Sequence, residues 1–155
     1  MPDTELAHGT ILAATFVPGG PKTKGSLDAV PGKKCQCCAK CNAHLPGFHM
    51  KEGVVGSKDW RRKMTYAIRQ CQVQLGRTSY VGAVTIVGSF YLPVKSVITP
   101  RAGDLDKLLR NTLDAAQDAN VYGDDVQVVR IVTDKYEATP LLPKGLSLII
   151  FAGRV

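Results

Sequence analysis

The sequence predicts an α+β fold, in which two main helices pack on a mixed, largely antiparallel sheet of about four strands in the order β-α-β-α-β-β. Three observations predict it. Two segments repeat apolar residues at the helical period, four short segments are rich in β-branched and aromatic residues, and only a turn of hairpin length separates the last two of these. The length of 155 residues is that of one compact domain, so we expect residues 1–155 to form a single domain.

The expected strands are short apolar runs bounded by turn residues. The first run, GTILAATFV, stops at a Pro-Gly-Gly-Pro turn, and the last two runs flank the turn TPLLPKG. β-branched and aromatic residues favour strands at residues 9–17, 79–91, 126–136 and 146–153.

The first expected helix covers residues 58–75, with Ser57 as a candidate N-cap. One face is apolar and comprises Trp60, Met64, Ala67, Ile68, Cys71 and Leu75. A second arc holds four cations and no acid, namely Lys58, Arg61, Arg62 and Arg69. Such a face is either a solvated surface or a track for DNA phosphates, and the sequence leaves both interpretations open. The second expected helix, at residues 104–119, has a broad arc of leucines and alanines.

Residues 18–56, between the first strand and the first helix, are rich in Gly, Pro, Lys and Cys, so we expect a long basic loop. Within it, Cys35, Cys38, Cys41 and His44 follow a C-x2-C-x2-C-x2-H spacing, and thiolates with an imidazole suit a structural Zn²⁺. A usual zinc module separates two ligand pairs by a dozen or more residues, and this segment does not. A zinc-ordered loop and a reduced, metal-free loop both stay open, whereas an iron–sulfur cluster and a disulfide are disfavoured.

The composition excludes several classes of protein. A net charge of +7 with 45% hydrophobic residues does not fit a disordered acidic tail, and no apolar run approaches the ~20 residues that span a bilayer. The first residues are acidic, unlike the basic start of a signal peptide. The five cysteines are an odd number and do not fit the disulfide framework of a secreted protein. We therefore expect a soluble, cytoplasmic protein.

The charge is divided between two parts of the chain. Residues 1–103 carry a net charge of +9 and residues 104–155 a net charge of −2. A basic surface beside an acidic cluster suits a metal-dependent nuclease, because cations hold phosphates while carboxylates hold the metal. A merely basic soluble protein is the alternative.

Four aspartates lie at the ends of two expected elements. Asp104 and Asp106 start the second helix, and Asp124 and Asp125 precede the third strand. Helix capping, the helix dipole and turn chemistry could each explain them. Alternatively, aspartates that converge would hold Mg²⁺, which prefers oxygen ligands. Arg110 lies one turn after Asp106 and could orient its carboxylate or reach a scissile phosphate.

The stretch RAGDLDKLLRNTLDAAQDANVYGDDVQV resembles the RusA-type Holliday junction resolvases, whose signature is an Asp-x-Asp that opens a helix and a later Asp-Asp pair that leads into a strand. The resemblance aligns Asp104, Asp106 and Asp125 with the three metal-binding catalytic aspartates of that family. This chain has Lys107 where the family usually has Asn, and Arg110 where it commonly has a helpful Lys. The second difference preserves charge but not geometry, since a guanidinium is a planar fork and an ammonium a point charge.

The resemblance implies a homodimeric, Mg²⁺-dependent endonuclease of DNA recombination and repair, which nicks two opposing strands of a four-way junction. In this interpretation Arg110 joins the three aspartates as a catalytic residue. DNA contacts are expected from Lys58, Arg61, Arg62 and Arg69 on the first helix, and from Arg101 and Lys107 beside the acidic pair.

The expected helix length suggests how the aspartates meet. A helix over residues 105–119 is about 22 Å long, whereas residues 120–124 span at most ~18 Å when extended. We therefore expect Asp125 to join Asp104 and Asp106 of a two-fold-related partner, so that each metal site spans the dimer. The competing hypothesis is a non-catalytic module with a zinc-ordered loop, which binds branched or single-stranded DNA by charge alone.

Overall fold

The computed structural model describes residues 6–23, 27–31, 48–52, 55–93, 97 and 104–155. Its helical elements are α1 (Ser57–Gln74), α2 (Leu105–Asp118) and the 3-10 turn η2 (Asp125–Gln127). Its strands are β1 (Ile11–Pro18), β2 (Leu27–Pro31), β3 (Phe48–Glu52), β4 (Val84–Leu92), β5 (Val128–Glu137) and β6 (Gly145–Ala152).

Four of these strands form one mixed sheet in the order β1-β6-β4-β5. β6 runs antiparallel to both β1 and β4, and β4 runs parallel to β5. Val87 in β4, for example, pairs with Ile149 of β6 on one side and with Val132 of β5 on the other. The predicted α+β class, the mixed and largely antiparallel sheet and the order β-α-β-α-β-β are confirmed.

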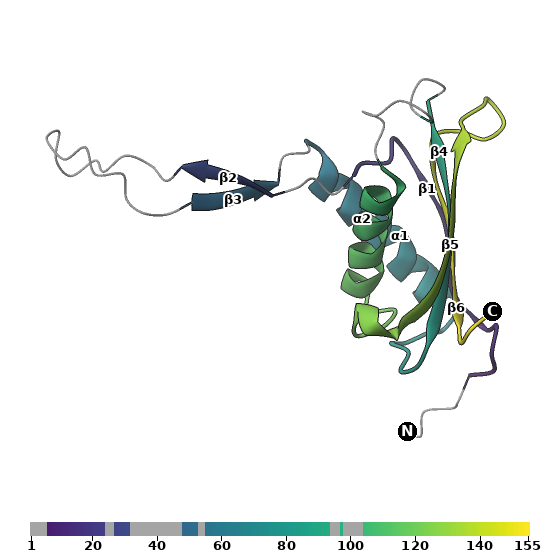
Figure 1. Ribbon diagram of the computed structural model, residues 1–155. Coiled ribbons are helices and arrows are strands. Elements are labelled where there is room, and N and C mark those ends of the chain that lie inside the picture. Colours follow the sequence, from purple (N-terminus) through teal and green to yellow (C-terminus); the bar gives the residue numbers. More distant parts are fainter. Residues whose placement is uncertain (1–5, 24–26, 32–47, 53–54, 94–96, 98–103) are drawn as a thin grey trace, which may run out of the picture.

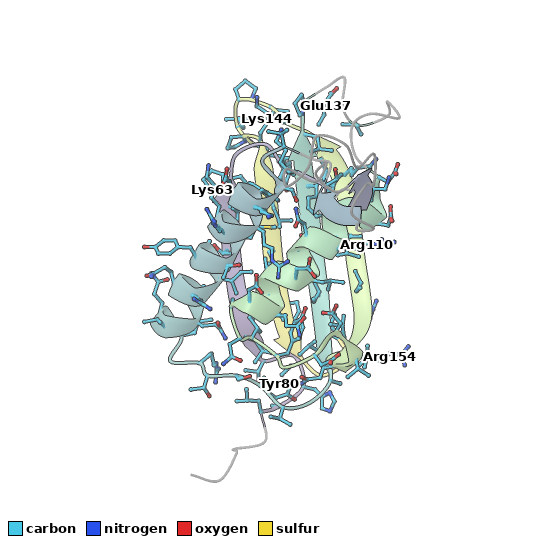
Figure 2. All side chains as sticks on the ribbon, turned by 90° about the vertical axis from the view of Figure 1, so that its left-hand side faces the viewer. Lys63, Tyr80, Arg110, Glu137, Lys144 and Arg154 are labelled. Atoms are coloured by element: carbon cyan, nitrogen blue, oxygen red, sulfur yellow. The ribbon has the colours of Figure 1, made fainter. Side chains whose placement is uncertain are left out.

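The last two strands are not neighbours, although the turn between them has hairpin length. β4 lies between β5 and β6, so the connection crosses over the end of β4, where the Ala138 amide donates to the Leu92 carbonyl at 2.7 Å. Figure 2 shows this end of the sheet, with Glu137 and Lys144 at the top and Tyr80 and Arg154 at the opposite end. β4 takes an interior place beside β6, because its residues are buried on both faces at its start, whereas most residues of the charged edge strand β5 are exposed.

Both helices cover the same face of this sheet (Figure 1), and α1 packs on β1 and on α2. The predicted apolar face of α1 is confirmed for Trp60, Met64, Ile68 and Cys71, which are all buried. Ala67 is partly buried, and Leu75, which caps the helix, is 44% exposed. Apolar side chains of β1, β4 and β6 complete the core between the sheet and the helices.

Ser57 is not the N-cap of α1 that the sequence suggested. The cap is Gly56, whose φ of 83° lies in the left-handed region that glycine enters at little cost. Ser57 is instead the first helical residue, and its side chain is buried against α2, where the Asn111 amide donates to its hydroxyl at 3.0 Å. A tertiary contact therefore replaces the local cap.

The opposite face of the sheet carries a row of aromatic side chains. Phe16 lies 6.3 Å from Tyr91, and Tyr91 stacks on Tyr136 at 5.7 Å, both measured between ring centroids. Phe16 and Tyr136 are 40% and 47% exposed, since both described helices lie on the other side (Figure 1). This face is thus apolar and solvated in the single chain.

The segment expected to be one long loop, residues 18–56, contains a two-stranded antiparallel ribbon. β2 pairs with β3 from Leu27 with Glu52 to Pro31 with Phe48, and Figure 1 shows this ribbon extending away from the helices. The loop prediction is therefore wrong for these ten residues. Within the described ranges, neither helix has the length and apolar character needed to cross a membrane.

Candidate nuclease site

Two of the three predicted metal ligands lie at the start of α2. Asp104 is the N-cap residue in an extended conformation, but its carboxylate pairs with Lys107 Nζ at 3.0 Å and makes no capping hydrogen bond. The Asp106 carboxylate pairs with Arg110 Nη2 at 3.3 Å, across one helical turn as expected. Both carboxylates are more than half exposed, so their oxygens remain accessible from solvent.

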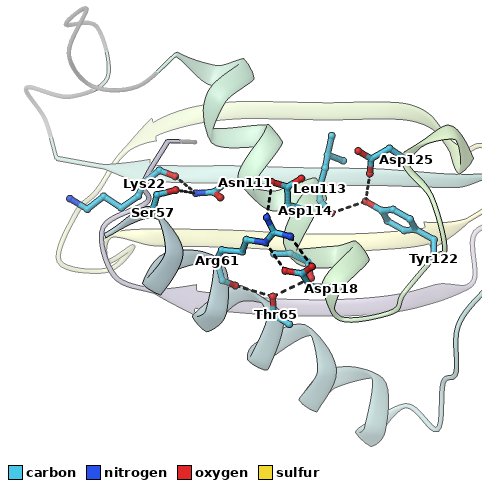
Figure 3. A network of polar contacts seen from close by, with 11 residues as sticks. Lys22, Ser57, Arg61, Thr65, Asn111, Leu113, Asp114, Asp118, Tyr122 and Asp125 are labelled. Atoms are coloured by element: carbon cyan, nitrogen blue, oxygen red, sulfur yellow. Dashed lines mark hydrogen bonds and ion pairs between the residues drawn. The ribbon is translucent and has the colours of Figure 1, made fainter. Parts of the chain in front are cut away.

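The third predicted ligand, Asp125, opens the short turn η2 that precedes β5. Its Oδ1 lies 3.5 Å from the Tyr122 hydroxyl, which donates to the Leu113 carbonyl of α2 at 3.1 Å (Figure 3). The chain after α2 therefore folds back along the helix. As a result, Asp125 lies beside the middle of α2 instead of beyond its far end.

Tyr122 is fully buried and stays protonated. Burial raises the pKa of its hydroxyl far above the ordinary value, and the nearby carboxylates of Asp125 and then Asp114 raise it further. A hydroxyl that holds its proton remains a hydrogen-bond donor. Tyr122 can therefore offer its proton to the Leu113 carbonyl and to Asp125 throughout the physiological pH range.

The three aspartates do not meet in one chain. Leu113, whose carbonyl shares Tyr122 with Asp125, lies about two turns or ~10 Å along α2 from Asp106. Within the part of the chain that the structure describes, no three His, Cys, Asp or Glu side chains form a group that could hold a metal. One chain thus presents an acidic pair at the start of α2 and, beside the middle of that helix, the carboxylate of Asp125.

Arg61 links α1 to α2 through two carboxylates (Figure 3). Its Nε and Nη2 contact the two oxygens of Asp118 at 2.5 and 2.7 Å, and its Nη1 contacts Asp114 Oδ2 at 3.1 Å. Thr65 stands beside it and donates to the Arg61 carbonyl at 3.0 Å. The cationic arc of α1, which contains no acid of its own, is therefore partly neutralised by α2.

The remaining cations of that arc line a groove on α1. It is bounded by Lys58, Arg61, Arg62, Thr65, Tyr66, Arg69 and Asp118. Arg62 is paired at 3.5 Å with Asp59, and Arg69 Nη2 donates to the Asp118 carbonyl at 2.5 Å. Tyr66 is 67% exposed in the groove and was not among the predicted site residues. Tyr66 could have been identified from the sequence by its position one helical turn after Arg62, next to the cationic arc.

A buried amide fixes the middle of α2 against the start of α1. Asn111 Nδ2 donates to the Lys22 carbonyl at 2.9 Å and to Ser57 Oγ at 3.0 Å (Figure 3). Asn111 follows Arg110 directly, so this contact holds the helical segment that carries Asp106 and Arg110. The sequence gives no local sign of it, because both partners are distant along the chain.

Several predicted residues lie outside the described ranges. They are the DNA-binding candidate Arg101 and the zinc candidates Cys35, Cys38, Cys41 and His44. The four zinc candidates lie in the sequence between Pro31 and Phe48, which are cross-strand partners.

A comparison with protein families matches the chain to the family described as endodeoxyribonuclease RusA, over residues 48–142. The matched region is more than half of the chain and runs from β3 to the connection between β5 and β6. It therefore includes α1, α2 and all three aspartates. A search of curated proteins found no match.

Proposed function

The chain belongs to the RusA endodeoxyribonuclease family, and we propose that it resolves four-way DNA junctions by a pair of symmetrical nicks in a Mg²⁺-dependent reaction. The observation that carries this proposal is the accessible acidic pair, Asp104 and Asp106, with Arg110 beside it and Asp125 next to the middle of the same helix.

The donor set of this site fits Mg²⁺. Asp104, Asp106 and Asp125 offer carboxylate oxygens, the hard ligands that this ion takes together with water and phosphate oxygens. None of the three is buried, and among the described residues Asp104 pairs with Lys107 and Asp106 with Arg110, so a divalent ion could replace those contacts. When bound there, Mg²⁺ would supply an activated water and compensate the charge of the reacting phosphate.

The protein's own residues have three roles in this mechanism. Arg110 is 67% exposed and is held at Asp106, where it can bind the scissile phosphate as negative charge builds on it. Lys107, Lys58, Arg62 and Arg69 bind neighbouring phosphates and set the position of the DNA. Arg61 adds charge to that surface while its guanidinium holds α1 to α2.

We further propose that the protein is a homodimer in which Asp125 of one chain completes the site of the other. Within one chain, Leu113, which lies near Asp125 through Tyr122, is ~10 Å along α2 from Asp106. This separation supports a shared site, because the ligands of one Mg²⁺ lie within a few ångströms of each other. Two sites related by a two-fold axis would also match the symmetry of paired nicks.

A cleavage assay tests the reaction. Wild-type protein should cut a synthetic four-way junction at two symmetrical positions on a denaturing gel, only when Mg²⁺ is present. Asp106→Asn should lose at least 100-fold in cleavage rate and keep junction affinity, because it removes a metal ligand and leaves the phosphate contacts. A wild-type protein that binds junctions but never cuts them would be a binding module, and the proposed function would then be wrong.

Mixing two inactive variants tests the shared site. Asp106→Asn and Asp125→Asn should each be inactive alone. In mixed dimers with shared sites, both defects fall in one site and the other site is intact, so single nicks should reappear after subunit exchange. If each site belongs to one chain, every site in the mixture carries a defect and no nicking will return.

A further inference from the structure

We propose that Gln127 is a positioning residue, which fixes the Gly123–Asp125 turn and so sets where the Asp125 carboxylate is offered to the metal. This inference rests on the proposed function. Gln127 does not touch the reacting groups itself and would act only through the backbone that carries Asp125.

The Gln127 side chain uses all of its hydrogen-bonding capacity on two backbone segments. Its Oε1 accepts from the Gly123 amide at 2.8 Å and from the Asp124 amide at 3.2 Å. Its Nε2 donates to the Tyr80 carbonyl at 3.1 Å and to the Gly82 carbonyl at 2.9 Å. A side-chain amide has two donor hydrogens and two acceptor sites, so all four are used.

These contacts attach the turn to the main sheet. Residues 80–82 lead directly into β4, and the Tyr80 amide donates to the Val121 carbonyl at 2.9 Å. Tyr80 also forms an isolated β-bridge with Tyr122. Gln127 is thus a connection between the central strand and the turn that precedes the edge strand.

The other polar contacts of the turn are also made to its backbone. Asp124 Oδ1 accepts from the Val126 amide at 3.0 Å, and Gln117 Nε2 of α2 donates to the Gly123 carbonyl at 3.0 Å. Asp124 is therefore used as a cap, while the exposed Asp125 carboxylate contacts the Tyr122 hydroxyl. Asp124 is therefore bound to the backbone of the turn, whereas the carboxylate of Asp125 remains accessible to a metal ion.

The consequence of losing this attachment follows from geometry. η2 has only three residues and cannot hold its own orientation, so without Gln127 the Asp125 carboxylate would sample a wider region. Displacement of a catalytic group by about 1 Å can cost on the order of 100-fold in rate. We expect weaker metal binding and slower cleavage, with little change in DNA affinity.

Two variants and one control test this. Gln127→Met removes all four hydrogen bonds at similar size, and Gln127→Glu keeps the acceptor but turns its second oxygen toward two carbonyls. Ile68→Val removes one buried methyl group from α1 and serves as the control for lowered stability, with melting temperatures measured for all three. The readouts are Mn²⁺ affinity by calorimetry without DNA, junction affinity in EDTA, and single-turnover cleavage.

For the Gln127 variants we expect at least a 10-fold loss in Mn²⁺ affinity and in cleavage, and junction affinity within 2-fold of the wild type. The control should change neither. If Gln127→Met binds Mn²⁺ as tightly as Ile68→Val does, the inference is wrong even where cleavage falls. Should the wild type cut no junction, the proposed function fails, and the Mn²⁺ comparison still decides whether Gln127 positions Asp125.

Discussion

The contact between Arg61 and the two α2 carboxylates allows a quantitative prediction, which concerns Arg61→Ala. Arg61 is 35% exposed, Asp118 is 43% exposed and Asp114 only 18% exposed. Exposed ion pairs contribute about 0.2–1 kcal/mol, and loss of one partner of a buried pair costs about 3–5 kcal/mol. A forked contact at intermediate burial should lie between these limits, so we expect the free energy of unfolding to fall by about 2 kcal/mol.

Urea denaturation followed by circular dichroism measures this change. For a chain of this size, the corresponding fall in melting temperature is about 4–8 °C. Arg61→Lys should recover part of the loss, because an ammonium keeps the charge but cannot contact Asp118 with two nitrogens. In a double-mutant cycle with Asp118→Ala, the coupling energy should be about 1 kcal/mol. A loss below about 0.5 kcal/mol for Arg61→Ala would contradict this prediction and place the contact among ordinary surface pairs.

Two further predictions concern DNA binding and alkaline pH. Lys58→Ala and Arg62→Ala should each lower the slope of log affinity for a junction against log salt by about 0.9, and an unchanged slope would remove that residue from the phosphate track. Tyr122→Phe should reduce the loss of stability above pH 10. The pKa of Tyr122 is raised from 10.0 by burial and by Asp125, so the stabilisation it provides is complete below pH 10 and is lost as the pH rises toward the folded value. Urea denaturation from pH 9 to 11 should show a shallower decline for the variant, by up to about 1.4 kcal/mol per pH unit, and equal slopes would contradict this.

The two main helices could be predicted from the spacing of their apolar residues, and the four strands of the main sheet from runs of β-branched and aromatic residues, whereas β2 and β3 were not predicted. Trp60, Met64 and Ile68 fall on one face of α1 whatever that face contacts, so their burial follows from spacing alone. The order of the strands does not follow from local spacing. Composition indicates which strand lies at an edge, because the charges of β5, among them Arg130 and Asp134, are typical of a strand at the edge of a sheet.

The site was predictable in its chemistry more than in its arrangement. The acids at the start of α2 follow from motif and spacing, and the i, i+4 pairing of Asp106 with Arg110 follows from helical geometry. The position of Asp125 was not predictable, because the two lengths give only the farthest point that the chain after α2 can reach and not the path that it takes. The chain reverses at Asn120, whose φ of 64° and whose neighbouring bond from the Val121 amide to the Ala116 carbonyl end α2. The Tyr122 hydroxyl then contacts the Leu113 carbonyl, and this tertiary contact has no local signature.

The β2–β3 ribbon has a consequence for how the chain tolerates changes in length. Its last pair, Pro31 with Phe48, brings together the two ends of a connection of sixteen residues. Loop-closure entropy rises slowly with length, by about 0.6 kcal/mol for each doubling. Insertion of a further sixteen residues between Pro31 and Phe48 should therefore cost the fold little, so a genetically encoded tag can be placed between these two partners.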